Sequence, residues 1–582
     1  MKYKIRRPLL LDEQNAFAGH SNLLSHLLFH RGVVSSDMAR EFILPDFASG
    51  THDPFLLKDA RKSAERVVQA IESDERIAIY SDYDADGIPG AAIFHDFFKR
   101  IGFKNFSIYI PHRHDEGFGV NSEAVRQLID EGVKLLITLD CGITDVLPVK
   151  LAKENGIDVI ITDHHEPPDA LPPAFGIIDH KQKDCEYPDK NLCGSGVAYK
   201  LIQAILKINR FGLKEGMEKW FLDLVGIATL SDMVPLVGEN RIFAKYGLAV
   251  LGKSQRKGLV QLFRKLKISQ KDVTEDDIVF MVTPRINAAS RMGVPMDAFH
   301  MLVAEDEDEA YSAVEHLDTI NNERKGVVAS LVKEVKKILR ERHMGSIPGA
   351  IVLGNPLWRP ALLGLVANSC AEEFRRPVFL WGRDGENMIK GSCRSEGTSS
   401  VVEIMRTAST GTFSQFGGHH HSGGFAVAND QIHFLEQKLN EAVEMIKSQR
   451  QTGGDTAKDG IQEDKIEDFM VDAELKLDDI NIGLFNDIDK LAPFGMANPK
   501  PIFIFRNILP ISIKKFGKTK DHVELIFNKK DGSKVSAISF FGATKDWAEK
   551  IRENVRIDLI ATLERSLFKG RPELRLRVVD II

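Results

Sequence analysis

Carboxylate side chains are crowded at one point early in the chain. Asp82, Asp84 and Asp86 lie within five residues, shortly after the apolar run at residues 76–80. Carboxylates this close repel one another and raise one another's pKa unless cations neutralise them. A calcium EF-hand also begins with such acids, but Ile93 stands where its bidentate glutamate must be. Taken alone, the cluster is equally consistent with a site for another divalent metal and with a solvated acidic turn.

The same chemistry recurs where other apolar or helix-like runs end. The acids and imidazoles at these ends are Asp140, Asp163, His164, His165 and Asp232. Carboxylates with imidazoles, and no pair of thiolates, suit Mn²⁺ or Mg²⁺ better than structural zinc. Two such ions can activate a water and stabilise the leaving oxygen when a phosphoester is cleaved. The spacing therefore favours metal-assisted phosphoester cleavage.

Repeated strand and helix patterns must position these side chains. From residue 61 to about 250, short runs rich in β-forming residues alternate with loops and helix-like stretches. This alternation predicts a parallel sheet with helices on its faces, an α/β fold. Ligands of such sheets bind beyond the carboxyl ends of the strands, which is where the acids fall.

The rest of the chain divides by pattern into further segments. A long helix, a second and smaller α/β unit, a polar linker and a run of short strands typical of a small β-barrel follow the first domain. The predicted boundaries are 1–60 for a helical lead, 61–304 for the first α/β domain, 305–345 for the connecting helix, 346–447 for the second α/β domain, 448–467 for the linker and 468–582 for the barrel.

Charge and cysteine content narrow the class of protein. The net charge is −6, yet residues 501–582 hold 17 Lys and Arg against 10 Asp and Glu, so the basic charge is concentrated in the barrel. The five cysteines are too few for a disulfide scaffold and form no C-x-x-C pair. No signal peptide and no apolar run of about 18 residues is found, which predicts a cytoplasmic protein without a membrane span.

Nine segments follow one another along the chain: SDYDADG, TLDCGI, ITDHHEPPDALP, LCGSGVAYKL, ATLSDMVPLVGENR, PRINAASRMG, KGSCRS, FGGHHHSGGF and PFGMANPKPIF. In this order they resemble the DHH phosphoesterase superfamily, named for the Asp-His-His element at 163–165. Along nearly its whole length the chain is similar to the bacterial exonucleases of that superfamily that act on single-stranded DNA. The resemblance implies a DHH domain, a long connecting helix, a DHH-associated domain and a C-terminal OB-fold.

The resemblance also implies roles for the clustered residues. The implied ligands of two Mn²⁺ or Mg²⁺ ions are Asp84, Asp86, Asp140, His164 and Asp232, with Asp140 bridging both ions. Asp82 is an implied supporting acid within the metal-binding set, Asp163 supports it from outside, and His165 contacts the scissile phosphate. Tyr80 stands where some DHH pyrophosphatases have a histidine ligand, and Asp179-His180 stands where the family usually has Asn-Pro.

Substrate contacts are implied in both α/β domains. The residues are Arg113, which helps hold the 5′-terminal phosphate, Arg285, Asn287 and Arg291 from PRINAASR, Ser392 and Arg394 from KGSCRS, and His419 from FGGHHHSGGF. Arginine matches phosphate oxygens with a bidentate fork. His420 and His421 receive no role. In the barrel, some of the aromatics Phe516, Phe527, Phe540, Phe541, Trp547 and Phe568 could stack bases, but most are expected to be core.

The implied function is a 5′-to-3′ exonuclease for single-stranded DNA that releases 5′-mononucleotides in DNA repair and recombination. Its expected partners are single-stranded DNA, a helicase and a single-strand-binding protein. One alternative is a DHH phosphodiesterase for short oligonucleotides or cyclic dinucleotides. Another is a non-catalytic, strand-binding replication scaffold, which the presence of all the metal acids disfavours.

Overall fold

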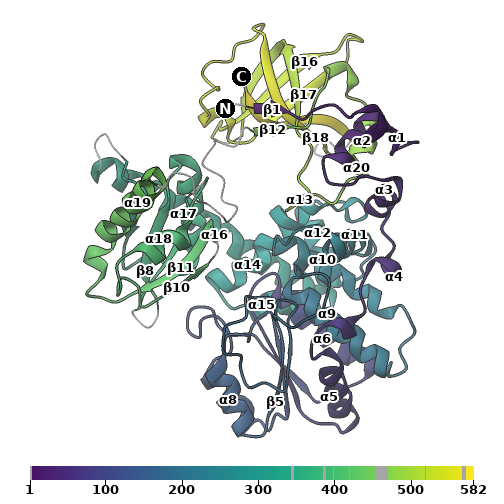
Figure 1. The fold of residues 1–582 in the computed structure, drawn as a ribbon, viewed down its shortest axis with the longest axis vertical. Helices are drawn as coiled ribbons and strands as arrows, with labels where there is room; N and C mark the ends of the chain where they lie inside the picture. Colours follow the sequence, from purple (N-terminus) through teal and green to yellow (C-terminus); the bar gives the residue numbers. More distant parts are fainter. Residues whose placement is uncertain are drawn as a thin grey trace. The chain divides into compact units, whose positions relative to one another are not determined.

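The 582-residue chain forms two compact units (Figure 1). The structure, a computed structural model, describes residues 3–342, 347–384, 388–397, 399–418, 420–452, 469–517, 519–566 and 572–582. One unit comprises Met1–Thr51, Met233–Lys245 and Asp464–Ile582, and the other comprises His52–Asp232 and Tyr246–Glu463. No helix among the described residues is both long and apolar enough to cross a membrane.

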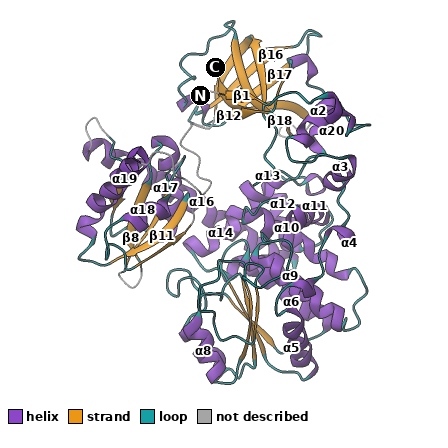
Figure 2. Ribbon diagram, in the orientation of Figure 1, coloured by secondary structure: helices purple, strands orange, loops and turns teal. Residues whose placement is uncertain are grey.

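The larger unit begins with a parallel sheet of strand order β3-β2-β4-β5-β6 (Figure 2). Its strands are β2 (Ile77–Ser81), β3 (Phe106–Tyr109), β4 (Leu135–Leu139), β5 (Asp158–Thr162) and β6 (Gly176–Ile178). Every residue of β2 and β4 is buried, because helices cover both faces of a parallel sheet. The predicted α/β domain with a parallel sheet is confirmed.

Two groups of helices cover this sheet. Helices α7 (Ser122–Asp130) and α8 (Val146–Glu154) pack on the face that presents Ala78 and Leu136. On the other face, α9 (Gly194–Ile208) contacts both α5 (Ala60–Glu72) and α6 (Gly87–Ile101). Further helices include α10 (Leu222–Ser231), α11 (Gly238–Leu251), α12 (Lys257–Leu266), α14 (Thr283–Met292) and α15 (Met296–Val303).

A long helix, α16 (Glu307–Arg342), leads to a second, mixed sheet of order β10-β11-β9-β8-β7. Its strands are β7 (Ile351–Gly354), β8 (Val378–Arg383), β9 (Ile389–Arg394), β10 (Gln415–Gly418) and β11 (Ser422–Val427), with helices α17 (Pro360–Phe374), α18 (Val401–Thr407) and α19 (Leu435–Thr452). Only β7 and β8 pair in parallel within it. Most of the predicted linker at 448–467 lies outside the described residues.

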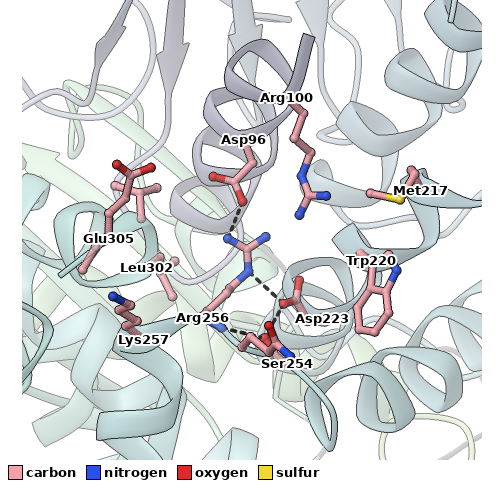
Figure 3. A pocket seen from close by; sticks show the side chains of 13 residues that line it. Asp96, Arg100, Met217, Trp220, Asp223, Ser254, Arg256, Lys257, Leu302 and Glu305 are labelled. Atoms are coloured by element: carbon pink, nitrogen blue, oxygen red, sulfur yellow. Dashed lines mark hydrogen bonds and ion pairs between the residues drawn. The ribbon is translucent and has the colours of Figure 1, made fainter. Parts of the chain in front are cut away.

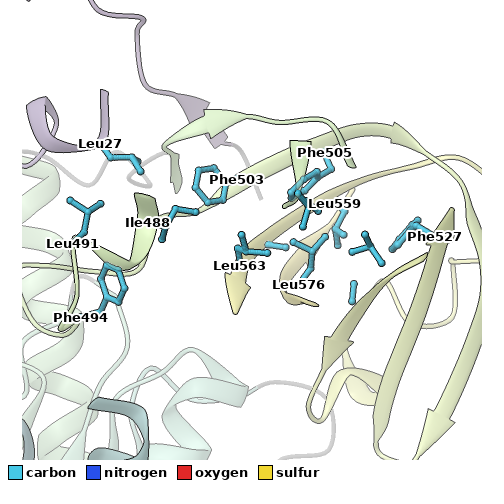
Figure 4. Packing of buried hydrophobic residues seen from close by; sticks show 14 of the residues in the cluster. Leu27, Ile488, Leu491, Phe494, Phe503, Phe505, Phe527, Leu559, Leu563 and Leu576 are labelled. Carbon is cyan, nitrogen blue, oxygen red and sulfur yellow. The ribbon is translucent and has the colours of Figure 1, made fainter. Parts of the chain in front are cut away.

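The smaller unit contains the predicted barrel. Its strand order is β13-β14-β18-β19-β17-β16-β15, from β13 (Ala473–Glu474), β14 (Phe503–Ile508), β15 (Pro510–Phe516), β16 (His522–Asn528), β17 (Lys534–Ser539), β18 (Ile557–Ser566) and β19 (Glu573–Ile581). Because β14 and β15 are separated only by Leu509 yet pair with β18 and β16, one bent segment closes the sheet on itself. Phe527 belongs to the core of this barrel, together with Phe503 and Leu576 (Figure 4). Trp547 is part of the same buried cluster.

Residues 1–51 belong to the same unit as the barrel. Helix α2 (Asn22–Phe29) contacts α20 (Ile482–Asp489) and buries Leu24, Leu27 and Leu28 in the barrel's apolar cluster. Strand β1 (Tyr3–Ile5) pairs with β12 (Phe469–Val471). Helix α2 is too short to be stable alone, so its apolar face packs on residues more than 450 positions away in the sequence.

A buried network of charged side chains connects helix α6 to α10 and to the start of α12 (Figure 3). Arg256 Nη1 lies 2.5 Å from Asp96 Oδ2, and Arg256 Nε lies 2.8 Å from Asp223 Oδ2. Ser254 Oγ also donates to Asp223, at 2.8 Å. These groups line a cavity of about 670 Å³. The side chains of Arg256, Asp96 and Asp223 are largely buried, so the charge of each must be balanced by its partners and not by water.

We predict that Arg256→Ala lowers the free energy of unfolding by about 3–5 kcal/mol, because it leaves two buried carboxylates without a cation. Urea denaturation followed by tryptophan fluorescence measures the change. Lys62→Ala, which removes the partly exposed ion pair with Asp59, is the control and should cost less than about 1 kcal/mol. Equal losses in the two variants would contradict the assigned importance of the network.

A candidate metal centre at the carboxyl edge of the parallel sheet

Backbone hydrogen bonds hold two of the three acids in the loop from β2 to α6, Asp84 and Asp86. Asp84 Oδ1 accepts from the N–H groups of Asp86 at 2.7 Å and Gly87 at 3.2 Å. Asp86 Oδ2 and Oδ1 accept from Gly194 N and Ser195 N, both at 2.7 Å. Gly194 and Ser195 begin helix α9, whose first N–H groups have no partner within the helix and favour an anion. Asp86 is thereby fixed in position.

Asp140 directly follows β4 and adopts a left-handed backbone with φ of 60°. Its backbone N–H donates to Thr162 O of the neighbouring strand at 2.9 Å. Gly194 approaches it so closely that a Cβ there would lie 2.5 Å from Asp140 Oδ1. The start of α9 therefore fits against this carboxylate only because residue 194 is glycine.

The Asp-His-His element follows β5 and turns its two imidazoles in different directions. Asp163 Oδ1 lies 2.7 Å from His165 Nδ1, and Asp163 Oδ2 accepts from Ile143 N at 3.0 Å. His164 instead faces the acids, with Nε2 3.0 Å from Asp140 Oδ1. Asp163 thus orients His165, while His164 has the carboxylates of Asp86, Asp140 and Asp232 within 4 Å.

Three groups of side chains, which share some members, could each hold a metal ion. Within each group, the three ligand atoms lie within 4.8 Å of one another. These groups are Asp82 with Asp84 and Asp140, Asp86 with His164 and Asp232, and Asp140 with His164 and His165. Asp232 comes from the end of α10, and its Oδ2 lies 3.8 Å from His164 Nδ1. The structure thus brings together every residue that the sequence predicted as a ligand, and Asp140 belongs to two groups.

Burial and mutual repulsion raise the pKa values of these carboxyl groups. Burial is the larger cause and the neighbouring acids add to it, so the pKa of Asp86 rises to about 6 and that of Asp232 to about 8. The pKa values of Asp82 and Asp140 are raised well above the usual range for the same two reasons. Burial also lowers the pKa of His164 to about 3, so its imidazole is neutral and able to bind a metal.

The two histidines are electrostatically distinct. Burial acts to lower the pKa of His165, but the hydrogen bond and charge of Asp163 outweigh it and raise the value to about 9. Burial likewise acts to raise the pKa of Asp163, but the hydrogen bond and charge of His165, together with the other neighbouring groups, outweigh burial and lower the pKa. His165 is therefore a cation near neutral pH, placed beside a neutral imidazole.

The donor set fits hard divalent cations. Among the described residues, buried Asp82 Oδ1 accepts no hydrogen bond, and neither does Asp140 Oδ1, although His164 Nε2 lies 3.0 Å from it. An unpartnered buried carboxylate oxygen is costly, and a cation would remove that cost. Oxygen ligands with one neutral imidazole match Mn²⁺ or Mg²⁺, and no thiolate is among them.

The residues that depart from the family pattern lie outside the three groups. Tyr80 packs on the α7 and α8 side of the sheet, and its hydroxyl donates to Gly119 O at 2.8 Å. Asp179 and His180 are fully buried after β6, where Asp179 Oδ1 accepts from Lys181 N and His180 Nε2 lies 3.0 Å from Leu192 O. These contacts are with the backbone of neighbouring loops, and none of the three residues belongs to the groups that could bind a metal.

The predicted substrate arginines do not share one environment. Arg285 is bonded to Asp318 of α16 at 2.7 Å and to Met281 O, so its charge is already neutralised. Asn287 Oδ1 accepts from Ala85 N at 2.9 Å and so braces the acidic loop. His419 lies outside the described residues, while Ser392 and Arg394 lie on β9.

Arg113, Arg291 and Arg394 have no carboxylate partner within the described part of the chain. Arg113 stacks over Tyr83 at 4.8 Å, Arg291 donates to Ala361 O of α17 at 3.0 Å, and Arg394 donates to Cys393 O at 2.7 Å. Burial, and then the nearby charges of Arg113 and Arg324, lower the pKa of Arg291 to about 9. Crowded, unneutralised guanidinium groups of this kind favour a bound polyanion.

Comparison with known proteins identifies the family. The N-terminal domain of the DHH family matches residues 76–229, the DHHA1 domain matches 348–451 and the RecJ OB domain matches 471–580. The single-stranded-DNA-specific exonuclease RecJ of Bacillus subtilis is 33% identical over 589 residues, covering 100% of this chain and 70% of that protein. The chain belongs to the RecJ family.

Other RecJ proteins support this assignment. RecJ of Haemophilus influenzae is 28% identical, with 91% of each chain covered. The crystal structure of Thermus thermophilus RecJ in complex with Mn²⁺ matches with a TM-score of 0.80 at 25% identity, covering 100% of this chain and 79% of that one. The predicted resemblance and the order of DHH, DHH-associated and OB domains are confirmed.

Three residues of this RecJ-family site were missed by the sequence reasoning. Gly194 and Ser195 hold Asp86 and approach Asp140, and the motif LCGSGVAYKL was the signal available for them. Arg324 adds positive charge beside Arg291 from the long helix α16. Nothing in the local sequence distinguishes Arg324 from the other charged residues of that helix.

We predict that Gly194→Ala weakens Mn²⁺ binding at least about tenfold, because the added methyl displaces the Asp140 carboxylate. Isothermal titration calorimetry measures the affinity, and circular dichroism checks the fold. Gly326→Ala is the matched control, since a Cβ at Gly326 meets no atom within 4 Å. Unchanged Mn²⁺ affinity in a folded Gly194→Ala protein would show that the close approach is unimportant.

Proposed function

We propose that this chain is a metal-dependent exonuclease that degrades single-stranded DNA from its 5′ end and releases 5′-mononucleotides. The observation that carries the proposal is that one unit contains both the buried carboxylate cluster and three arginines, Arg113, Arg291 and Arg394, that have no carboxylate partner among the described residues. The relatives named above, which are single-stranded-DNA-specific exonucleases, support the same substrate. A role in DNA repair and recombination follows from this activity.

Asp84, Asp86, Asp140, His164 and Asp232, with Asp82 in support, would hold two Mn²⁺ or Mg²⁺ ions. The RecJ of Thermus thermophilus has been crystallised with each of these metals. When bound, such ions lower the pKa of water and neutralise charge on the phosphate under attack. The protein's own part is to hold the ligands rigidly and to present the His165 cation, oriented by Asp163, to a non-bridging phosphate oxygen.

Arg113, Arg291, Ser392 and Arg394 would hold the 5′-terminal phosphate. A terminal phosphate carries more negative charge than an internal one, so clustered guanidinium groups select the strand end. Arg285 and Asn287 would not contact the substrate directly. Arg285 is paired with Asp318, and Asn287 accepts a hydrogen bond from Ala85 N in the acidic loop. Polarity of digestion would then follow from where the end is bound.

The barrel offers a separate surface for the strand. Phe540 and Phe541 are 39% and 64% exposed, and Arg577 stacks over Phe540 at 3.9 Å. His522 contacts both phenylalanines, at ring distances of 5.2 Å and 5.0 Å. Exposed aromatics with cationic neighbours are typical of surfaces that stack bases without sequence preference. Phe527 and Trp547 are core residues, and Phe568 lies outside the described residues.

A strand-binding barrel favours long single strands over dinucleotides, and the complete set of acids favours catalysis over a scaffold. A helicase, a single-strand-binding protein and a cytoplasmic location remain predictions.

We predict that, with Mn²⁺, the protein releases label from 5′-labelled single strands as mononucleotides at the first turnover, and leaves duplex ends largely intact. A thirty-nucleotide strand should be a better substrate than a dinucleotide. Asp140→Asn should reduce turnover more than about a hundredfold while strand binding is retained. Asp130→Asn, an exposed acid at the end of α7, is the control and should behave as wild type. Initial release of label from the 3′ end, or full turnover by Asp140→Asn, would refute the proposal.

We predict that Arg394→Ala removes most of the preference for a 5′-phosphate over a 5′-hydroxyl end. The expected loss is about tenfold or more in kcat/KM for the phosphorylated strand, because a charge-assisted contact disappears. Activity on the hydroxyl-ended strand should change much less. Arg340→Ala, at the exposed end of α16, is the control. Equal losses on both strands would mean that Arg394 does not read the end phosphate.

A further inference from the structure

Two helices that carry candidate metal ligands are connected at both of their ends. Helix α6 begins directly after Asp86, and helix α10 ends directly before Asp232. At this end the two acids belong to one of the groups that could hold a metal ion. At the opposite end, Asp96 of α6 and Asp223 of α10 both contact Arg256 (Figure 3). The two helices therefore run in opposite directions between the candidate metal centre and Arg256.

The length of the helices separates these two ends. Asp96 lies ten residues after Asp86, and Asp223 lies nine residues before Asp232. At a rise of about 1.5 Å per residue, Arg256 acts about 13–15 Å away from the acids. Helices α6 and α10 also contact each other directly. Because close-packed helices transmit strain, a change in their spacing at one end changes the spacing at the other.

Like charges oppose this arrangement at the metal end. Ligand oxygens of Asp86 and Asp232 lie within 4.8 Å of each other. Carboxylates at this distance repel one another unless a cation lies beside them. The repulsion falls as α6 and α10 move apart, so a second contact between the helices is needed to keep the acids close before an ion binds.

Arg256 supplies the opposing attraction. Its Nη1 lies 2.5 Å from Asp96 Oδ2, and its Nε lies 2.8 Å from Asp223 Oδ2. Burial acts to raise the pKa of Asp96, but the hydrogen bond from His95 and the charge of Arg256 outweigh burial and lower the pKa. Asp96 is therefore ionised at neutral pH. One planar guanidinium group thus bridges two helices, with a different nitrogen for each carboxylate.

Side-chain packing is incomplete where Arg256 makes these contacts. The same groups line the cavity of about 670 Å³, whose walls also include Arg100, Met217 and Leu302. Side chains on opposite sides of a cavity do not gain dispersion energy from each other. The contacts of Arg256 therefore carry much of the attraction between these two helix ends.

We propose that Arg256 is a positioning residue for the metal centre. By joining α6 to α10 at one end, it keeps Asp86 and Asp232 at the separation that a divalent cation requires at the other end. The inference rests on the proposed function, in which both acids are metal ligands. Arg256 acts through the two helices and takes no part in bond cleavage. Its effect is to organise the ligands before the ion binds.

Arg256→Lys tests this role, because lysine keeps the charge but cannot bridge two carboxylates with a planar fork. The Mn²⁺ affinity of the folded protein, measured by isothermal titration calorimetry, should fall about threefold to thirtyfold, the range for coupling through packed groups. In exonuclease assays, the Mn²⁺ concentration for half-maximal activity should rise by a similar factor. At saturating Mn²⁺, kcat and the KM for DNA should stay close to wild type, because the bound ions then hold the acids together.

Asp223→Asn provides an independent comparison, since it removes one charge from the network and keeps the shape of the side chain. It should weaken Mn²⁺ binding in the same direction. The double variant Arg256→Lys with Asp223→Asn should lose little more affinity than the weaker-binding single variant, because both changes disrupt the same contact.

Leu439→Ala is the matched control for a loss of stability alone. Leu439 is fully buried in the apolar cluster of the second α/β domain, and its truncation destabilises the fold by leaving a cavity. This variant should lower the midpoint of thermal unfolding and leave Mn²⁺ affinity unchanged. Circular dichroism confirms that every variant is folded at the temperature of the titration.

Two kinds of result overturn the inference, and they are distinguishable. If Arg256→Lys and Asp223→Asn bind Mn²⁺ as tightly as wild type, or if Leu439→Ala loses as much affinity as they do, Arg256 stabilises the fold without positioning the metal ligands. If wild type itself binds no Mn²⁺, the ligand assignment in the proposed function fails, and the role of Arg256 fails with it.

Discussion

Electrostatic repulsion among buried carboxylates is the constraint on which this structure depends. Asp82, Asp86 and Asp140 are buried at one edge of the parallel sheet, with Asp84 and Asp232 beside them. The fold opposes part of that repulsion with backbone N–H groups, since Asp84 and Asp86 each accept two such bonds. Asp82 Oδ1 and Asp140 Oδ1 nevertheless accept no hydrogen bond from the residues that the structure describes, so these residues alone do not satisfy the cluster. Divalent cations are the natural complement to such a site.

Positive charge around the site is divided between structural and available arginines. Arg256 and Arg285 are neutralised by buried or partly buried aspartates and hold helices together. Within the described part of the chain, the contacts of Arg113, Arg291 and Arg394 are to an aromatic face or to backbone carbonyls. Sequence motifs alone do not separate these two classes, because the partner of Arg285 lies 33 residues away on α16. Only the second class can neutralise a phosphate without first losing a protein partner.

Much of the architecture could be predicted from local patterns. The strand runs and the helices between them indicated a parallel sheet, and the carboxyl ends of parallel strands must share one edge, so the clustering of Asp82, Asp140 and Asp163 was predictable. The packing of α2 against the barrel was not, because an amphipathic helix shows which face is buried but not what covers it. The sequence also did not indicate that residues 233–245 belong to the smaller unit. Their contacts are with distant residues, since Arg241 donates to the backbone carbonyls of Phe42 and Ala492.

The sequence by itself determined which side chains could bind divalent metals, because residue type and position at strand ends are local properties. The tertiary structure decided how each is used. It turned His164 toward the acids and His165 toward Asp163, placed Gly194 against Asp140, and joined α6 to α10 through Arg256. These relations depend on distances between residues that are far apart in sequence or on rotations of neighbouring side chains, and neither is encoded in a spacing pattern.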